Sequence, residues 1–251
     1  MAGLPLDLPA RAVKPREQGL THVLDRGLSI AEVDGLVEVA GASVDIVKLG
    51  WGTALATGNL EPKLQRYRDH DIPVVLGGTL TELAIQQGRV DELAAWLDHL
   101  EIRHVEVSDG TIDLERDRKL ALITRLSDSF TVLSEVGSKD ATHVMAPYRW
   151  VEQIQAELDA GAWKVICEAR ESGTAGIARP DGELREGLID EIAHAVDQTR
   201  IVFEAPQKDQ QVHLLKRFGP DVNLGNIAPA DVLALETMRL GLRSDTMEPG
   251  A

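Results

Sequence analysis

TVLSEVG, residues 131–137, is a short β-branched apolar run that carries a carboxylate near its end. Seven further runs of this kind recur along the chain: LTHVLD (20–25), VDIVKLG (44–50), PVVLGG (73–78), HVEVSDG (104–110), KVICEAR (164–170), IVFEAP (201–206) and VNLGNI (222–227). Each run is followed by a segment with the apolar spacing of an amphipathic helix, such as WVEQIQAELDA (150–160). This alternation predicts βαβ units whose strands form a parallel sheet.

The helical segments carry start signals of their own. Ser29 and Glu32 have capping-box spacing, in which the hydroxyl and the carboxylate each satisfy a backbone N–H at the helix start. Thr79 and Glu82 have the same spacing. Asn59 suits the cap position of the helix that follows it. These signals predict helices between the apolar runs.

Eight strand–helix units in 251 residues match a single (β/α)₈ TIM barrel of the α/β class. The right-handed crossover rule makes closure of such a sheet natural. A doubly wound open sheet is the alternative, but it would need a glycine-rich turn after the first strand, and LDRGLS (24–29) is a poor one. We expect one barrel domain over residues 1–251, with a short N-terminal extension (about 1–15) and a C-terminal tail (about 244–251) outside the barrel.

Composition limits the classes of function. The formal net charge of −15 argues against binding of nucleic acids or anionic membranes, because phosphate-rich surfaces attract basic proteins. A small anionic substrate is still compatible, since local cations and a metal can reverse the field inside a cleft. The single cysteine, Cys167, lies in an apolar run, which favours a packed core residue. No segment approaches the ~20 apolar residues that span a bilayer, so we expect a cytoplasmic protein.

Charged residues stand at or just past the ends of these apolar runs. The carboxylates are Asp25, Glu106, Asp109, Glu135, Glu168 and Glu204, and the cations are Lys48, Lys139 and Arg170. The carboxyl ends of parallel barrel strands meet at one rim, so we expect these side chains to converge there. Alternation supports this, because Glu135 shares a strand face with the apolar Leu133. Carboxylates turned toward the helices would be costly to desolvate, which favours the barrel mouth.

Two interpretations of this charge cluster remain open. Barrel mouths can hold structural Glu–Lys and Glu–Arg pairs. The excess of acidic over basic groups would instead be offset by a hard cation such as Mg²⁺, which takes oxygen ligands and retains waters. The pattern indicates a metal without separating direct ligands from their neighbours.

Two segments with glycine suggest an anion site. Gly77–Thr79 and Asn223–Pro229 expose backbone N–H groups before a helix, and such helix starts attract phosphate. Loops after the seventh and eighth strands are the usual phosphate site of this fold. A tight turn explains each segment by itself, but the position of both at the same rim favours phosphate binding.

Longer polar blocks lie mainly at the strand ends and in the loops. They are KPREQGLTHVLDRGL (14–28), VDIVKLGWGT (44–53), PVVLGGTL (73–80), VEVSDGTI (105–112), VLSEVGSKD (132–140), EARESGTAGI (168–177), FEAPQK (203–208), KRFGPDVNLGNIAP (216–229) and GLRSDT (241–246). Together they resemble the phosphosulfolactate synthase family over nearly the whole chain and in order.

This resemblance implies a Mg²⁺-dependent (β/α)₈ lyase that adds sulfite to phosphoenolpyruvate, giving (2R)-3-sulfo-2-phospholactate. In methanogens the reaction opens coenzyme M biosynthesis, and some bacterial relatives make sulfolactate. The candidate catalytic residues are Lys139, as general acid, and Lys48. The candidate substrate-binding residues are Arg16, Lys48, Gly78, Thr79, Arg170, Asn226 and Arg243. The candidate metal-binding residues are Glu106, Asp109, Glu135 and Glu168.

Two other functions stay open at this point. The first is a different phosphoenolpyruvate or phosphosugar lyase or isomerase on the same barrel. The second is a non-catalytic protein similar to a plant branch of stress-associated relatives, although the intact Lys48, Lys139 and Arg170 argue against it. The resemblance also implies a homo-oligomer, with a trimer as the candidate assembly.

Overall fold

Eight parallel strands close into a barrel in the order of the sequence, as the strand spacing predicts. The computed structural model describes residues 7–138 and 145–247. The strands are β1 (Thr21–Asp25), β2 (Ile46–Leu49), β3 (Val74–Leu76), β4 (His104–Val107), β5 (Thr131–Val136), β6 (Lys164–Cys167), β7 (Ile201–Glu204) and β8 (Leu224–Ile227). Thr21 of β1 pairs with Leu224 of β8, which closes the sheet and excludes the open doubly wound alternative.

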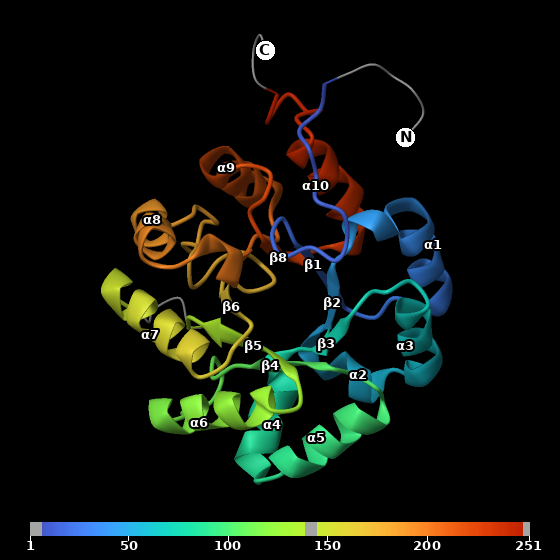
Figure 1. Ribbon diagram of the computed structural model, residues 1–251, viewed down its shortest axis with the longest axis vertical. Helices are drawn as coiled ribbons and strands as arrows, with labels where there is room; N and C mark the ends of the chain where they lie inside the picture. Colours follow the sequence, from blue (N-terminus) through green and yellow to red (C-terminus); the bar gives the residue numbers. More distant parts are fainter. Residues whose placement is uncertain (1–6, 139–144, 248–251) are drawn as a thin grey trace.

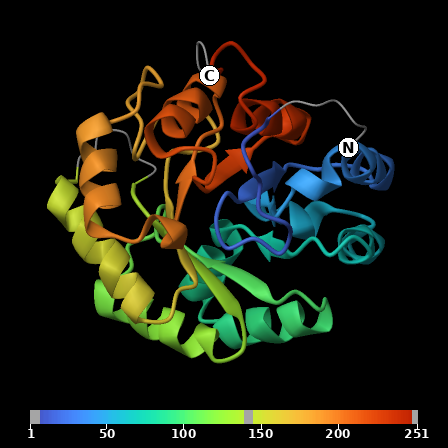
Figure 2. The ribbon, with the colours of Figure 1, turned by 45° about the horizontal axis from the view of Figure 1, so that its top comes forward.

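Helices surround the strands on the outside of the barrel (Figures 1 and 2). They are α1 (Ile30–Ala40), α2 (Thr53–Ala56), α3 (Leu60–Arg68), α4 (Gly78–Gln87), α5 (Val90–His99), α6 (Arg116–Ser127), α7 (Pro147–Asp159), α8 (Glu186–Ala195), α9 (Lys208–Phe218) and α10 (Val232–Arg239). Short 3₁₀ turns are η1 (Gly41–Ser43), η2 (Gly50–Gly52), η3 (Gln198–Arg200) and η4 (Pro229–Asp231). The segment before β1 runs beside α10, where Arg11 pairs with Glu236 at 2.9 Å (Figure 1).

One of the two predicted capping boxes forms. At the start of α1, Ser29 N donates to Glu32 Oε2 at 2.7 Å, and Glu32 N donates to Ser29 Oγ at 3.3 Å. The prediction for Thr79 and Glu82 was wrong: α4 has Gly77 at its cap, and Glu82 is buried against a neighbouring loop. Hydrogen bonds to that loop replace the local cap.

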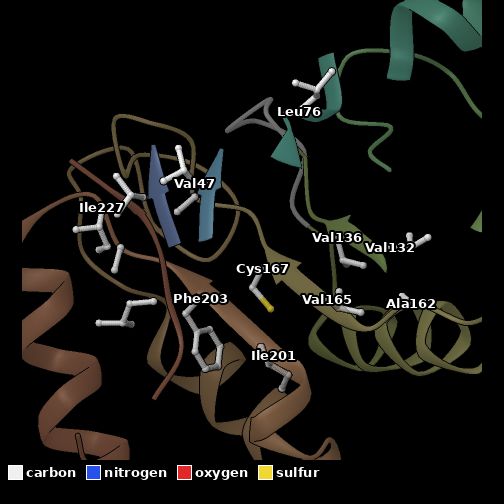
Figure 3. Packing of buried hydrophobic residues seen from close by; sticks show 14 of the residues in the cluster. Val47, Leu76, Val132, Val136, Ala162, Val165, Cys167, Ile201, Phe203 and Ile227 are labelled. Carbon is white, nitrogen blue, oxygen red and sulfur yellow. The ribbon is translucent and has the colours of Figure 1, made fainter. Parts of the chain in front are cut away.

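The core lies in two layers that follow from side-chain alternation along each strand. Outward-facing residues such as Phe203, Cys167 and Val165 pack between the sheet and the helices (Figure 3). Cys167 is fully buried there, as predicted. A second, smaller cluster is formed by Ile46, Val75, Leu133, Ile166 and Val202. These residues face the barrel interior and fill its middle.

The apolar interior cluster places the next inward-facing residues at the carboxyl end of the barrel. Each of these residues comes two positions after a member of that cluster: Lys48, Glu135 and Glu204 on the same strand, and Glu168 one residue past the end of β6. Alternation therefore turns them into the barrel mouth above an apolar floor. None of the helices in the described part of the chain has the length and apolar character needed to cross a membrane.

Candidate active site

A cavity of about 230 Å³ opens at the carboxyl ends of the strands. We call it the mouth cavity, and its lining residues are Leu24, Lys48, Gly50, Trp51, Gly77, Gly78, Thr79, Glu106, Thr111, Glu135, Glu168, Arg170, Glu171, Glu204 and Asn226. They come from the ends of all eight strands or from the loops that follow them. Charged side chains that are far apart in the sequence thus meet in one small space.

Lys48 lies at the centre of the charges. Its Nζ is 3.2 Å from Glu106 Oε2 and 3.2 Å from Glu204 Oε1, and the residue is 6% exposed. Burial by itself would lower the pKa of Lys48, but the carboxylates of Glu106, Glu204, Glu135 and Glu168 together hold that pKa well above its ordinary value. Lys48 is therefore a permanently charged ammonium group at neutral pH.

The surroundings of Glu106, in contrast to those of Lys48, disfavour the charged form of the side chain. Burial raises the pKa of Glu106, and the nearby Glu135 and Glu204 raise it further, against the opposing effects of Lys48 and the Gly78 N–H. Gly78 N donates to Glu106 Oε1 at 2.6 Å, which leaves Oε2 for Lys48. Burial and the neighbouring acids therefore favour the neutral form of the Glu106 carboxyl more than water does.

The backbone at the end of β6 holds two further carboxylates in place. Ala169 N donates to Glu204 Oε2 at 3.0 Å, and Arg170 N donates to Glu168 Oε1. Arg170 has a left-handed backbone with φ of 64°, which an L-residue rarely adopts. This turn brings both the N–H and the side chain of Arg170 to the mouth cavity.

The donor groups of the cavity are of the kind that a hydrated Mg²⁺ prefers. Its carboxylates outnumber Lys48 and Arg170, and Asn226 Oδ1 is buried without accepting a hydrogen bond from the described residues. Within residues 7–138 and 145–247, no three His, Cys, Asp or Glu side chains are close enough to hold a metal ion by themselves. Mg²⁺ commonly uses one or two carboxylates and keeps several waters, so the oxygen-rich cavity fits such an ion.

Not every predicted carboxylate reaches the cavity. Asp109 Oδ1 accepts from Lys119 Nζ at 2.9 Å and does not line the mouth cavity. Asp25 is also turned away: it pairs with Lys63 at 2.6 Å and accepts from Tyr67 OH at 2.9 Å. Both acids are neutralised by helix residues outside the barrel interior, so the structure does not group them with the mouth glutamates.

Two arginines lie apart from the mouth cavity. Arg16 precedes β1 and pairs with Asp45 at 2.8 Å, just before β2, so it lies at the amino end of the barrel. The structure therefore does not bring Arg16 together with the candidate substrate-binding residues that line the mouth cavity. Arg243 is 3.5 Å from Asp245 and does not line the cavity. Lys139 lies outside the described residues.

At the start of α4, one of the backbone N–H groups that we expected to bind phosphate is already used within the protein. Gly78 lines the cavity, but its N–H is already donated to Glu106. Thr79 and Asn226 also line the cavity. An anion at the start of α4 would therefore be met by the Thr79 N–H and the helix dipole, with the Gly78 N–H committed elsewhere.

Sequence reasoning missed Glu82. Its carboxylate, 1% exposed, accepts from Ser108 Oγ at 2.6 Å and from Thr111 Oγ1. Ser108 in turn packs so closely on Gly78 that an added Cβ there would lie 2.0 Å from Ser108 Oγ. Glu82 therefore holds the loop after β4 against the start of α4 and fixes one wall of the mouth cavity. A buried acid inside an otherwise amphipathic helix was the available signal.

Replacement of Glu82 by glutamine is expected to lower the free energy of unfolding by about 1–3 kcal/mol. The amide NH₂ can only donate, so one of the two hydroxyls from the loop after β4 must turn to accept from it. Urea denaturation would measure the loss. Glu92→Gln, at an exposed position on α5, is the matched control and is expected to leave the midpoint unchanged. Equal urea midpoints for both variants would contradict the role of Glu82 in holding the loop after β4 against α4.

The closed parallel barrel with a charged cavity at its carboxyl end defines the class: an enzyme that binds a small molecule at the mouth of a (β/α)₈ barrel. A model of the family "(2R)-phospho-3-sulfolactate synthase (ComA)" matches residues 9–245. The chain belongs to this family.

Curated relatives agree with this assignment over nearly the full length. The chain is 43% identical over 244 residues to the phosphosulfolactate synthase of Bacillus subtilis, covering 96% of this chain and 97% of that protein. It is 41% identical over 245 residues to the phosphosulfolactate synthase of Methanothermobacter thermautotrophicus, covering 95% of each.

Solved structures show the likeness of the fold. The YdjI aldolase of Escherichia coli K12 matches with a TM-score of 0.58 at 12% identity, covering 93% of this chain and 83% of that one. The 3-hexulose-6-phosphate synthase of Salmonella typhimurium matches with a TM-score of 0.56 at 13% identity, covering 88% and 99%. At such identities the matches extend to the barrel architecture only.

Proposed function

We propose that this protein is a phosphosulfolactate synthase, which joins sulfite to phosphoenolpyruvate to give (2R)-3-sulfo-2-phospholactate. The observation that carries the proposal is the placement of the buried Lys48 ammonium among glutamates at the barrel mouth, in a chain of this family. Phosphoenolpyruvate is a small polyanion, and a cavity of about 230 Å³ with fixed cations suits such a substrate.

The chemistry needs a place for negative charge. The sulfur lone pair of sulfite attacks the methylene carbon of phosphoenolpyruvate, and the double-bond electrons move onto the adjacent carbon and its carboxylate. A proton delivered to that adjacent carbon then completes the product. A fixed ammonium group stabilises such developing charge without reorganisation, and this is the role proposed for Lys48.

The remaining roles follow from charge and position. Arg170 lines the cavity and can bind phosphate or carboxylate through two parallel N–H groups. Thr79 at the start of α4 offers a backbone N–H to the phosphate. Lys139 is proposed as the general acid on the family resemblance, because a positioned ammonium group can deliver the proton from one face.

A bound Mg²⁺ would add positive charge beside the substrate carboxylate. Glu135 and Glu168, with the neutral oxygen of Asn226, are the proposed groups that hold it, directly or through water. Glu106 is the weaker candidate, because both of its oxygens are engaged by Gly78 and Lys48. Asp109 is left out of the proposed set because it pairs with Lys119 outside the cavity.

Replacement of Glu135 by glutamine is expected to weaken Mg²⁺ binding by about 10–100-fold, the usual range for loss of a group near a metal. Removal of one negative charge lowers the attraction for the cation while the side chain keeps its size. Isothermal titration of Mg²⁺ into the protein measures the change. Glu38→Gln, exposed on α1, serves as the control. An identical titration curve for Glu135→Gln and the unaltered protein would remove Glu135 from the metal site.

Direct assay tests the proposed function. Purified protein with Mg²⁺, sulfite and phosphoenolpyruvate is expected to consume both substrates in equal amounts and to form one phosphorylated product with a new carbon–sulfur bond, detected by phosphorus and carbon NMR. Omission of sulfite is expected to stop the reaction. Release of inorganic phosphate, or turnover of phosphoenolpyruvate without sulfite, would instead indicate another lyase or hydrolase.

Assembly and location complete the proposal. We propose a cytoplasmic homo-oligomer, with a trimer as the candidate form on the family resemblance. Sedimentation equilibrium of the purified protein measures the subunit number, and a single species at the mass of one chain would contradict it.

A further inference from the structure

Strained backbone gathers at the mouth cavity. Five of the described residues other than glycine have positive φ angles: Trp51 (55°), Asp71 (52°), Glu101 (56°), Arg170 (64°) and Asn226 (56°). Three of them, Trp51, Arg170 and Asn226, line the mouth cavity. Residues held in this region of φ and ψ cost free energy, and such residues concentrate at functional sites.

Trp51 is the least expected of the three. Asparagine tolerates the left-handed conformation through its short polar side chain, but a bulky residue does so rarely. Trp51 adopts φ of 55° and ψ of 25° within η2, and 52% of it is exposed. By contrast Trp150, a core residue, is 1% exposed. The position of Trp51 therefore combines backbone strain with exposure of apolar surface, and packing of the core does not require it.

The surrounding chain holds the indole at this place. Trp51 follows Lys48 by three positions, between two glycines that make close contacts: a Cβ at Gly50 would lie 2.6 Å from Leu24 Cδ1, and one at Gly52 would lie 3.3 Å from Leu80 Cδ2. The guanidinium carbon of Arg26 stands 5.6 Å from the centroid of the indole ring. A cation over the face of a tryptophan is attracted by the ring and limits its motion.

We propose that Trp51 is a specificity-determining residue that contacts the substrate on the β2 side of the mouth cavity, and that Arg26 is a positioning residue for its indole. This inference rests on the proposed function and adds a residue to it. An indole at the rim excludes water, so the cations Lys48 and Arg170 act on the anionic substrate in a medium of lower dielectric. It also narrows the entrance, which favours a three-carbon phosphate over a sugar phosphate.

Two substitutions distinguish the contribution of the indole ring from that of the left-handed backbone at position 51. Trp51→Phe keeps an aromatic ring, and Trp51→Asn removes it with a residue that accepts the left-handed conformation. We expect the KM for phosphoenolpyruvate to rise about tenfold in Trp51→Asn, equivalent to about 1.4 kcal/mol of binding free energy, with a smaller change in kcat. Trp51→Phe is expected to keep KM within about threefold of the unaltered protein, since most of the ring contact remains. The thermal midpoint of Trp51→Asn should not fall.

Glu101→Asn is the matched control, because Glu101 has a φ of 56° like Trp51 but does not line the mouth cavity. We expect it to leave KM and kcat unchanged. For Arg26, Arg26→Gln is expected to raise KM in the same direction as Trp51→Asn, and Arg26→Lys, which retains a cation for the ring, is expected to restore it.

Fluorescence supplies a measurement that does not depend on turnover. Titration of phosphoenolpyruvate, without sulfite, is expected to change the tryptophan emission of the unaltered protein and not that of Trp51→Phe, which should still bind the substrate. An unchanged KM in Trp51→Asn, or an emission change that persists in Trp51→Phe, would overturn the inference and leave the proposed function intact. Absence of phosphoenolpyruvate binding in the unaltered protein would overturn both.

Discussion

Lys48→Met is expected to lower kcat by about 10²–10³-fold, the usual cost of losing one fixed group that stabilises developing charge. The same variant is expected to be less stable by about 3–5 kcal/mol, because removal of one partner leaves buried charges uncompensated. Lys48 Nζ lies 3.2 Å from both Glu106 and Glu204, each nearly fully buried. Methionine fills a similar volume, so the losses of kcat and stability are expected to come from removal of the positive charge.

The stability deficit of Lys48→Met is expected to depend on pH. Burial already raises the pKa of Glu106 in the folded protein. A carboxyl with a raised folded pKa favours the fold below its unfolded pKa and loses that contribution as the pH rises through the folded value. Without Lys48 the ionised glutamates are less tolerated, so the deficit should be larger at about pH 8 than at about pH 5.

Lys63→Met is the matched control for this experiment. Lys63 is also buried, at 2% exposure, and pairs with Asp25 at 2.6 Å, but it does not line the mouth cavity. Urea denaturation should show a comparable loss of stability for both variants. At urea concentrations or temperatures at which both variants are still folded, only Lys48→Met should lose turnover. Equal kcat in the two variants would place Lys48 outside the chemistry.

Lys139→Ala is expected to reduce turnover by about 10²–10⁴-fold, the range for loss of a general acid. The unfolding midpoint should change little if the residue serves catalysis, and a small primary amine added to the buffer should restore part of the rate by supplying the missing proton donor. Lys208→Ala, at a partly exposed lysine paired with Asp245, is the control. Full activity of Lys139→Ala without added amine would exclude this role.

Strand periodicity made most of the mouth cavity predictable. Inward-facing positions on parallel strands are fixed once the apolar floor is known, so Lys48, Glu135, Glu168 and Glu204 could be assigned from their distance to Ile46, Leu133, Ile166 and Val202. The same rule explains one miss. Asp25 is one position past the inward-facing Leu24, so it points toward the helices, where Lys63 neutralises it.

Positions outside the strands could not be assigned in this way. Asp109 lies two residues beyond the end of β4, where alternation no longer holds, and Lys119 draws it outward. Arg16 shares a sequence block with the end of β1, but it precedes that strand. The length of β1 therefore separates Arg16, at the amino end of the barrel, from the mouth cavity at the carboxyl end. The left-handed turn at Trp51 depends on contacts of the neighbouring glycines with Leu24 and Leu80, which no local pattern reveals.

The most direct measurement is a crystal structure of the protein with phosphoenolpyruvate and Mg²⁺. We expect the substrate in the mouth cavity, with its carboxylate or phosphate on Lys48 and Arg170 and the metal on the side of Glu135 and Glu168. A larger cavity of about 740 Å³, lined by Arg16, Asp45 and Trp163, lies at the amino end of the barrel. Substrate bound there, with the mouth cavity empty, would contradict the account.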